Sequence, residues 1–113
     1  MKAIAACLQE PKKLVLKERE ITLGDDEVLV KTHKASICGT DKNEFLGLVS
    51  HYRSYPMEVY GHEGAGVVEA VGAKVTKFKA GDKVMNYWRR GTFSTYWKAG
   101  QDQLFIAPEG LDM

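Results

Sequence analysis

The chain has few cysteines, no long apolar run and almost no excess of either charge, and each shortage excludes a class of protein. Two cysteines, Cys7 and Cys38, are too few for a disulfide framework, so a reducing, cytoplasmic setting is expected. No apolar stretch approaches the roughly 20 residues of a membrane span, and the Gln-Glu-Pro at residues 9–11 cuts short any signal peptide. With 16 basic against 15 acidic side chains, no concentrated basic patch indicates nucleic-acid binding.

The rest of the sequence is punctuated by turn residues and indicates one small domain rich in strands. Short runs with many β-branched residues alternate with turns at residues 24–26 and 81–82. We therefore predict a mainly β (β-rich α+β) fold, a barrel or sandwich with one or two short helices, over residues 1–113. The expected helix runs from Asp41 to about Leu48, with Thr40 or Asp41 as its cap. The predicted strands are residues 2–8, 14–20, 27–37, 66–72, 82–85, 95–98 and 103–107.

Two short motifs contain residue types that bind zinc. Cys38 begins a Cys-Gly-Thr-Asp segment, and His62 and Glu63 lie within a Gly-His-Glu-Gly segment. Cysteine, histidine and glutamate all ligate zinc, and a catalytic zinc takes three protein ligands and keeps a fourth position open. Cys38 and His62 are 24 positions apart (62 − 38), far more than the spacing in a zinc finger. A zinc site here must therefore be closed by the tertiary structure.

The segment Gly64-Ala65-Gly66 resembles the beginning of a dinucleotide-binding fingerprint but lacks the rest of it. The third glycine would fall at position 69, which is Glu69, and a valine-rich strand follows instead of a helix. The fingerprint needs a helix N-terminus at this point to hold the pyrophosphate. We therefore expect no cofactor-binding residue in this chain.

Taken in order, the motifs resemble one family, the zinc-dependent medium-chain alcohol and polyol dehydrogenases. The matching segments are the two zinc-type motifs, the Gly-Ala-Gly-Val-Val run that follows Glu63, the pair Val71-Gly72, and the Gly-Asp-Lys-Val segment that begins at Gly81. The resemblance covers nearly the whole chain and implies a partly open GroES-like β-barrel, the N-terminal catalytic domain of such an enzyme. Family members continue into a Rossmann domain that binds NAD or NADP, so we expect a fragment or isolated domain that is inactive alone.

The same resemblance implies the activity of the full-length protein. That protein would oxidise an alcohol to a carbonyl by hydride transfer to NAD or NADP, with zinc polarising the substrate oxygen. The expected partner is a small alcohol, polyol or sugar; nucleic acid and membrane are not expected, and an oligomer would form through the missing domain. Many relatives take a further zinc ligand from a later segment, so this chain alone should hold zinc weakly.

The resemblance gives a role to five residues. Cys38 matches the thiolate zinc ligand and His62 the imidazole ligand. Glu63 matches either a third ligand or a carboxylate just behind the metal. Asp41 matches the carboxylate that receives the free ring N–H of the ligand histidine, although it also suits a helix N-cap. Thr40 matches the hydroxyl that contacts the substrate oxygen and begins the proton relay, with a helix cap as its alternative.

The chain also departs from the family pattern. Many relatives have a histidine three residues after the threonine; here Asn43 cannot titrate, so the relay would pass through water, the cofactor ribose or Glu44. No cysteine occurs in residues 85–93, so we expect one catalytic zinc and no structural zinc. Trp88 lies near the position of a substrate-pocket aromatic and could stack on a sugar face or simply pack in the barrel.

Two other classes of protein use the same fold. A GroES-like binding module without catalysis leaves Cys38, Asp41 and His62-Glu63 unexplained. A zinc-free relative of the quinone-reductase type has no use for Cys38 together with His62. A metal assay on the full-length protein would separate the zinc enzyme from both.

Overall fold

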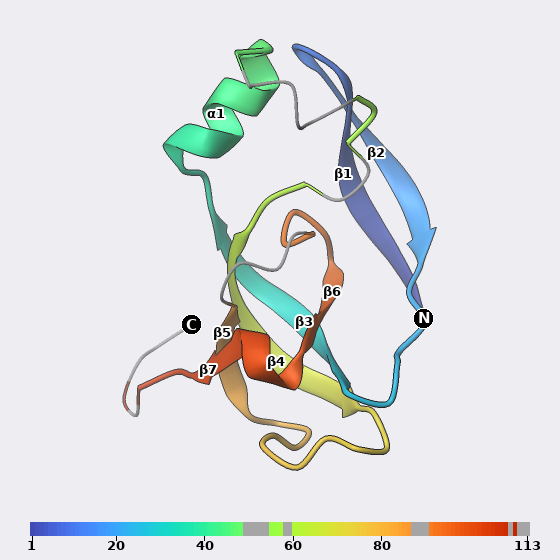
Figure 1. Ribbon diagram of the computed structural model, residues 1–113, viewed down its shortest axis with the longest axis vertical. Helices are drawn as coiled ribbons and strands as arrows, with labels where there is room; N and C mark the ends of the chain where they lie inside the picture. Colours follow the sequence, from blue (N-terminus) through green and yellow to red (C-terminus); the bar gives the residue numbers. More distant parts are fainter. Residues whose placement is uncertain (49–54, 58–59, 87–90, 109, 111–113) are drawn as a thin grey trace.

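The strands of the chain form two antiparallel sheets. The computed structural model describes residues 1–48, 55–57, 60–86, 91–108 and 110. Its elements are β1 (Lys2–Glu10), β2 (Lys13–Glu20), β3 (Glu27–Ser36), α1 (Gly39–Leu46), β4 (Glu63–Val71), β5 (Lys83–Asn86), β6 (Tyr96–Gly100), the 3-10 helix η1 (Gln101–Gln103) and β7 (Leu104–Ile106). The smaller sheet is the β1–β2 hairpin, and the larger has the strand order β6-β3-β4-β5-β7. In Figure 1 the hairpin and α1 stand above the larger sheet.

The mainly β fold predicted from the sequence is confirmed. Among the described residues, seven strands are accompanied by one α-helix and one 3-10 helix. The larger sheet curls so that valines from several of its strands meet, as the partly open barrel requires (Figure 1). No helix of the described part of the chain has the length and apolar character to cross a membrane.

The main core lies inside the curl of the larger sheet. Val28 and Val30 of β3 are fully buried there against Trp97 of β6, which is 2% exposed. Leu29, between the two valines, points the other way and packs with Ala3 and Ile21 under the hairpin. The first half of β3 is therefore buried on both faces, which explains its unbroken apolar run. Burial of each of these side chains stabilises the fold by about 1.5–3 kcal/mol.

Most element boundaries differ from the sequence prediction by one or two residues, and the starts of α1 and β4 differ in ways that affect the two zinc-type motifs. Helix α1 begins at Gly39 with Cys38 as its N-cap, so neither Thr40 nor Asp41 occupies the cap position. Its end is set by Gly47, whose φ of 76° is left-handed and favours glycine. Strand β4 begins at Glu63 rather than at residue 66, because antiparallel pairing with β3 carries it through its glycines. Local propensity alone disfavours glycine in a strand, and here the tertiary pairing overrides it.

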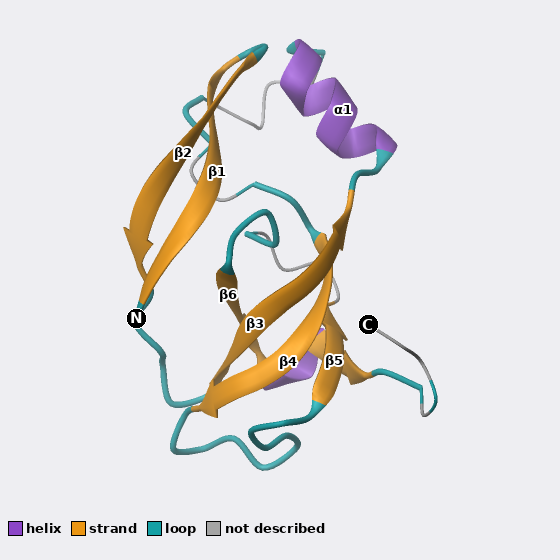
Figure 2. Ribbon diagram, turned by 180° about the vertical axis from the view of Figure 1, so that it is seen from behind, coloured by secondary structure: helices purple, strands orange, loops and turns teal. Residues whose placement is uncertain are grey.

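The pairing of β3 with β4 brings the two zinc-type motifs together. The last pair of this ladder is Ser36 with Glu63, so the end of β3 and the beginning of β4 are neighbours. Cys38 follows β3 by two residues and His62 precedes β4 by one. Figure 2 shows β3 leading directly into α1 at this end of the sheet, with β4 beside it. An antiparallel pair therefore closes a gap that is long in sequence.

Candidate active site

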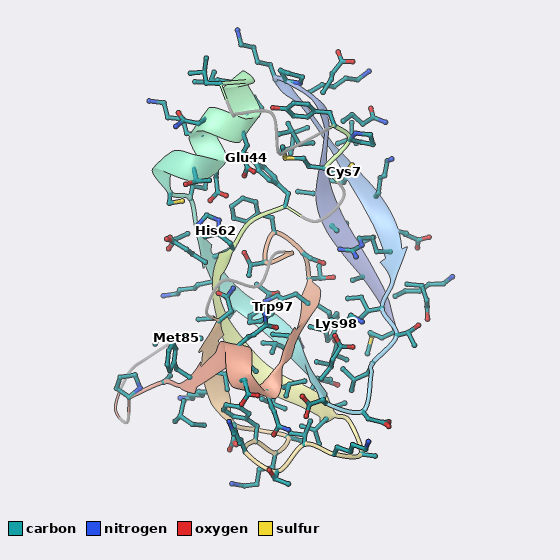
Figure 3. The ribbon with its side chains drawn as sticks, in the orientation of Figure 1. Cys7, Glu44, His62, Met85, Trp97 and Lys98 are labelled. Atoms are coloured by element: carbon teal, nitrogen blue, oxygen red, sulfur yellow. The ribbon has the colours of Figure 1, made fainter. Side chains whose placement is uncertain are left out.

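The side chains of Cys38 and His62 meet where α1 begins. The Cys38 Sγ lies 3.1 Å from the His62 Nε2, and both residues are partly buried. Figure 3 shows His62 beside the first turn of α1. The structure thus brings together the two residues that the sequence analysis identified as zinc donors. A thiol and an imidazole nitrogen at this distance can share a proton or bind one metal ion between them.

Asp41 lies behind His62 and connects it to the helix. Its Oδ1 is 3.2 Å from the His62 Nδ1, within ion-pair distance although without the alignment of a full hydrogen bond. Its Oδ2 accepts the Cys38 backbone N–H at 3.1 Å, as a residue at the third helical position does in a capping box. Asp41 is 0% exposed. Asp41 is therefore not the N-cap itself, but its carboxylate both bonds the backbone of the N-cap residue and faces the histidine ring.

Tyr60 and residues 91–93 contact the backbone next to this cluster. The Tyr60 hydroxyl donates to the Asp41 backbone carbonyl at 2.5 Å, and its ring meets that of Phe93 edge-on at 5.2 Å. The Gly61 carbonyl accepts the N–H groups of Gly91 and Thr92 at 2.8 and 3.3 Å. The sequence analysis missed Tyr60; an aromatic residue directly before the Gly-His-Glu-Gly segment is the one signal that could have indicated it.

Gly61 has a conformation that only glycine adopts readily. Its φ is 86°, and a Cβ there would lie 2.6 Å from the Phe93 ring. A side chain at this position would be strained and would push the ring away. The first glycine of the Gly-His-Glu-Gly segment therefore serves the turn that presents His62.

The other predicted site residues lie around the cluster rather than inside it. Thr40 is exposed in the first turn of α1, two residues after Cys38. Glu63 is exposed at the start of β4 and lies outside the group of donors formed by Cys38, Asp41 and His62, whose ligand atoms are within 4.8 Å of one another. Trp88 falls outside the described residues.

Described residues line one hollow that reaches the cluster at Asp41 and another that lies beside Glu63, and the two differ in character. One of about 490 Å³ lies between α1 and the hairpin, next to Asp41, and its walls are almost entirely apolar, with Phe45 and Phe93 among them. The other, of about 390 Å³, lies beside Glu63 and has Lys34 and Ser36 in its wall together with apolar side chains. The wall of the second hollow is the more polar of the two, and its Lys34 and Ser36 lie next to the predicted site residue Glu63.

A thiol, an imidazole and a buried carboxylate in series are suited to two kinds of chemistry. The same order of groups can activate a cysteine as a nucleophile or hold a metal ion, with the carboxylate fixing the histidine in both cases. The geometry alone allows either.

The sequence matches the model of one protein family. Residues 24–111 match the family described as the alcohol dehydrogenase GroES-like domain. This match includes the Cys38 and His62 motifs and most of the chain.

Several of the similar curated proteins and solved structures are named as dehydrogenases or other oxidoreductases. An L-galactonate-5-dehydrogenase of Escherichia coli (strain K12) is 42% identical over 77 residues, which are 67% of this chain and 22% of that protein. An uncharacterized zinc-type alcohol dehydrogenase-like protein of the same organism is 41% identical over 87 residues, 74% of this chain and 25% of that protein. A quinone oxidoreductase of Pseudomonas syringae pv. Tomato DC3000 superposes with a TM-score of 0.82 at 26% identity, over 97% of this chain and 35% of that structure.

These comparisons agree on the family and on the extent of the match. The chain spans about a quarter or less of the length of the two curated relatives. The donor group of Cys38, Asp41 and His62 lies within the matched residues. The chain therefore belongs to the medium-chain alcohol dehydrogenase family, as a GroES-like domain.

Proposed function

We propose that the chain is the catalytic domain of a zinc-dependent alcohol or polyol dehydrogenase. In the full-length protein it would oxidise an alcohol to a carbonyl, with hydride transfer to NAD or NADP. The observation that carries this proposal is the 3.1 Å approach of the Cys38 thiol to the His62 imidazole, with the buried Asp41 carboxylate behind it. The relative named as a zinc-type alcohol dehydrogenase-like protein supports the same chemistry.

The donor set fits a zinc ion. Cys38 and His62 would be the ligands, through Sγ and Nε2, because the other ring nitrogen of His62 faces Asp41. Metal-binding histidines commonly direct their second nitrogen at a carboxylate in this way. The Asp41 Oδ1 is buried and has no aligned hydrogen-bond donor among the described residues, which supports a role as acceptor for the N–H of a metal-bound ring. Glu63 remains a candidate third ligand from the start of β4.

Zinc would supply a Lewis acid that polarises the substrate oxygen. The residues of the chain would do the rest. Thr40, exposed two residues after Cys38, would accept the hydrogen bond of the substrate hydroxyl and so orient its carbon. Bound NAD or NADP would take up the hydride from that carbon, and the hydroxyl proton would leave through Thr40. One alcohol and one oxidised cofactor thus give one carbonyl, one reduced cofactor and one proton.

The proton must then reach water. Asn43 is exposed but carries no titratable group, and Glu44 is 0% exposed in α1. A fully buried carboxylate cannot pass a proton directly to bulk solvent. We therefore favour water or the cofactor ribose over Glu44 as the group that takes the proton from Thr40, which is itself exposed.

The substrate is proposed to carry several polar groups. The hollow beside Glu63 offers an ammonium from Lys34 and a hydroxyl from Ser36. One similar protein is named for its action on L-galactonate, which is a polyhydroxy acid. We therefore favour a polyol or sugar acid over a simple alcohol, while the identity of the substrate depends on residues of the full-length protein.

The zinc proposal is tested by removing each donor in turn. Cys38→Ser and His62→Ala should each abolish stoichiometric zinc uptake, measured by atomic absorption after dialysis against a zinc buffer. Cys7→Ala and His33→Ala are the matched controls, because Cys7 is buried on β1 and His33 is exposed on β3, away from the donor group. Circular dichroism should show the same β-rich fold in all four variants.

The same experiment separates the rival classes. Zinc uptake that survives in both Cys38→Ser and His62→Ala would contradict the zinc site. In the full-length protein, alcohol oxidation by the metal-free enzyme at full rate would favour the zinc-free, quinone-reductase type, whose fold this chain shares.

A further inference from the structure

We infer that Asn86 is a positioning residue for the zinc donors, acting through the backbone of the turn that carries His62; this rests on the proposed function. Asn86 is the last residue of β5 and is partly buried. Its side-chain Nδ2–H donates to the His62 carbonyl at 2.7 Å, and its Oδ1 accepts the Gly64 N–H at 2.7 Å. One side chain therefore bonds the two peptide groups on either side of Glu63.

The Asn86 side chain continues the β4–β5 ladder where the backbone pairing stops. β5 pairs with β4 up to Met85, which lies opposite Ala65. The next pair in the same register would be Asn86 with Gly64. Asn86 instead pairs its backbone with Leu104 of β7 and offers its amide to β4. These two bonds give the first residues of β4 hydrogen-bond partners on the β5 side beyond the last backbone pair of that ladder.

Only an amide suits this place. An asparagine side chain donates and accepts at the same time, and the two backbone groups that it meets are one acceptor and one donor. An aspartate of the same size could accept from Gly64, but as an ionised group it could not donate to the His62 carbonyl and would repel it. Asparagine is uncommon in strands, so its presence here calls for a local reason.

The opposite side of the turn is closed by Thr92. A Cβ at Gly64 would lie 2.8 Å from the Thr92 side chain, so the backbone of the turn is packed against it. The turn is thus held between the Asn86 amide on one side and Thr92 on the other. The direction in which His62 leaves the backbone is fixed by these contacts, and with it the 3.1 Å approach of Nε2 to the Cys38 Sγ. A metal site tolerates errors of only about 0.5 Å in its ligands, so loosening this turn should weaken metal binding.

The test is a titration of the chain with Co²⁺, whose absorption reports a bond to thiolate and the coordination geometry. Asn86→Asp and Asn86→Ala should each weaken Co²⁺ binding by about 10- to 100-fold, the usual effect of losing a group that orients a ligand. The Co²⁺–thiolate absorption band at saturation should also shift or weaken, because the imidazole no longer meets the metal at the same angle. A change in stability alone would lower the apparent affinity but would leave the absorption band at saturating metal unchanged.

Gln101 provides a matched control. It is a buried amide that also holds a turn: its Oε1 accepts the N–H groups of Thr76 and Lys77 at 3.0 and 3.3 Å, and its Nε2 donates to the Lys74 carbonyl at 3.3 Å. Gln101 follows Gly100, which pairs with Glu27, the first residue of β3. The zinc donors lie beyond Ser36, the last residue of β3, so Gln101 and Asn86 act at opposite ends of this strand. Gln101→Glu should lower stability in urea and leave Co²⁺ affinity and spectrum unchanged.

The possible outcomes distinguish this inference from the proposed function. If the unmodified chain binds Co²⁺ with a thiolate band and both Asn86 variants match it within about twofold, well under the effect expected, Asn86 does not position the donors. If Asn86→Asp fails to fold, the smaller Asn86→Ala change decides the question. If the unmodified chain binds no better than Cys38→Ser, the zinc site itself is wrong and this inference falls with it. If Gln101→Glu loses as much Co²⁺ affinity as the Asn86 variants, the loss is a general effect of lower stability, and the inference that Asn86 positions the donors is wrong.

Discussion

At the scale of single residues, Asp41 carries two functions that a sequence cannot separate. One oxygen of its carboxylate accepts the Cys38 N–H and the other faces His62. The first function stabilises the start of α1, and the second would hold His62 in the tautomer that leaves Nε2 free for a metal. Because the two oxygens belong to one group, a substitution that keeps only one of them can tell the functions apart.

Asp41→Asn and Asp41→Ala should therefore differ. The asparagine keeps an acceptor for the Cys38 N–H and should change stability little, but without the charge beside His62 it should weaken zinc binding by about 10- to 100-fold. The alanine should lose the same affinity and also about 1 kcal/mol of stability, as expected when a helix cap is removed. Zinc competition with a chromophoric chelator and urea unfolding measure the two effects. Wild-type zinc affinity in Asp41→Asn would show that Asp41 only stabilises the start of α1, through its bond to the Cys38 N–H.

The residues that the sequence identified and those that it missed differ in kind. Cys38 and His62 were found because their side-chain chemistry is specific, and the structure places them in contact. Tyr60 and Asn86 contribute through hydrogen bonds to backbone groups, which depend on the register of strands and the path of a turn. Such contacts leave no pattern in a single sequence beyond an unusual residue in a strand, so they could not be predicted.

At the scale of elements, the sequence predicted the presence of each strand along the chain better than the residues at which it begins and ends. The valine-rich runs predicted β3 and β4 correctly, since β-branched residues suit a pleated, buried surface. The start of β4 was missed because it contains Gly64 and Gly66, which local propensity assigns to a turn. Gly66 is required in the strand because the backbone of β3 passes very close to it, whereas Gly64 packs against Thr92. A Cβ at Gly66 would lie 2.1 Å from the Lys31 carbonyl oxygen.

Gly66→Ala should therefore be strongly destabilising. The obstacle is a backbone oxygen of the neighbouring strand, which cannot move without breaking the β3–β4 ladder. We expect a loss of about 3 kcal/mol or more in the free energy of unfolding, at the upper end of overpacking effects. Gly39→Ala is the matched control, since a Cβ there meets nothing within 4 Å and alanine favours the helix. Equal midpoints of urea unfolding for the two variants would show that the close approach is not limiting.

At the scale of the whole molecule, the fold assembles the donor group but holds only part of what the proposed reaction requires. The curl of the larger sheet and the helix after β3 bring Cys38, Asp41 and His62 together. The resemblance found in the sequence predicted this architecture, because glycine turns and valine runs occur in the family order. The sequence could not show where Glu63 lies relative to the donors, since that depends on how β4 bends at its first residue.

The last prediction concerns the cofactor: the 113-residue chain should bind neither NAD nor NADP. Gly64, Ala65 and Gly66 lie inside β4 and pair with β3, so their backbone cannot cradle a pyrophosphate as a fingerprint loop before a helix does. The α-helix that the described residues contain, α1, offers no substitute, because the Asp41 carboxylate already accepts an N–H at its start and would repel a phosphate. Calorimetry with either nucleotide should show no saturable heat, whereas the full-length protein should bind one of them. Saturable binding by this chain would contradict the prediction and require a nucleotide site that the matched domain does not explain.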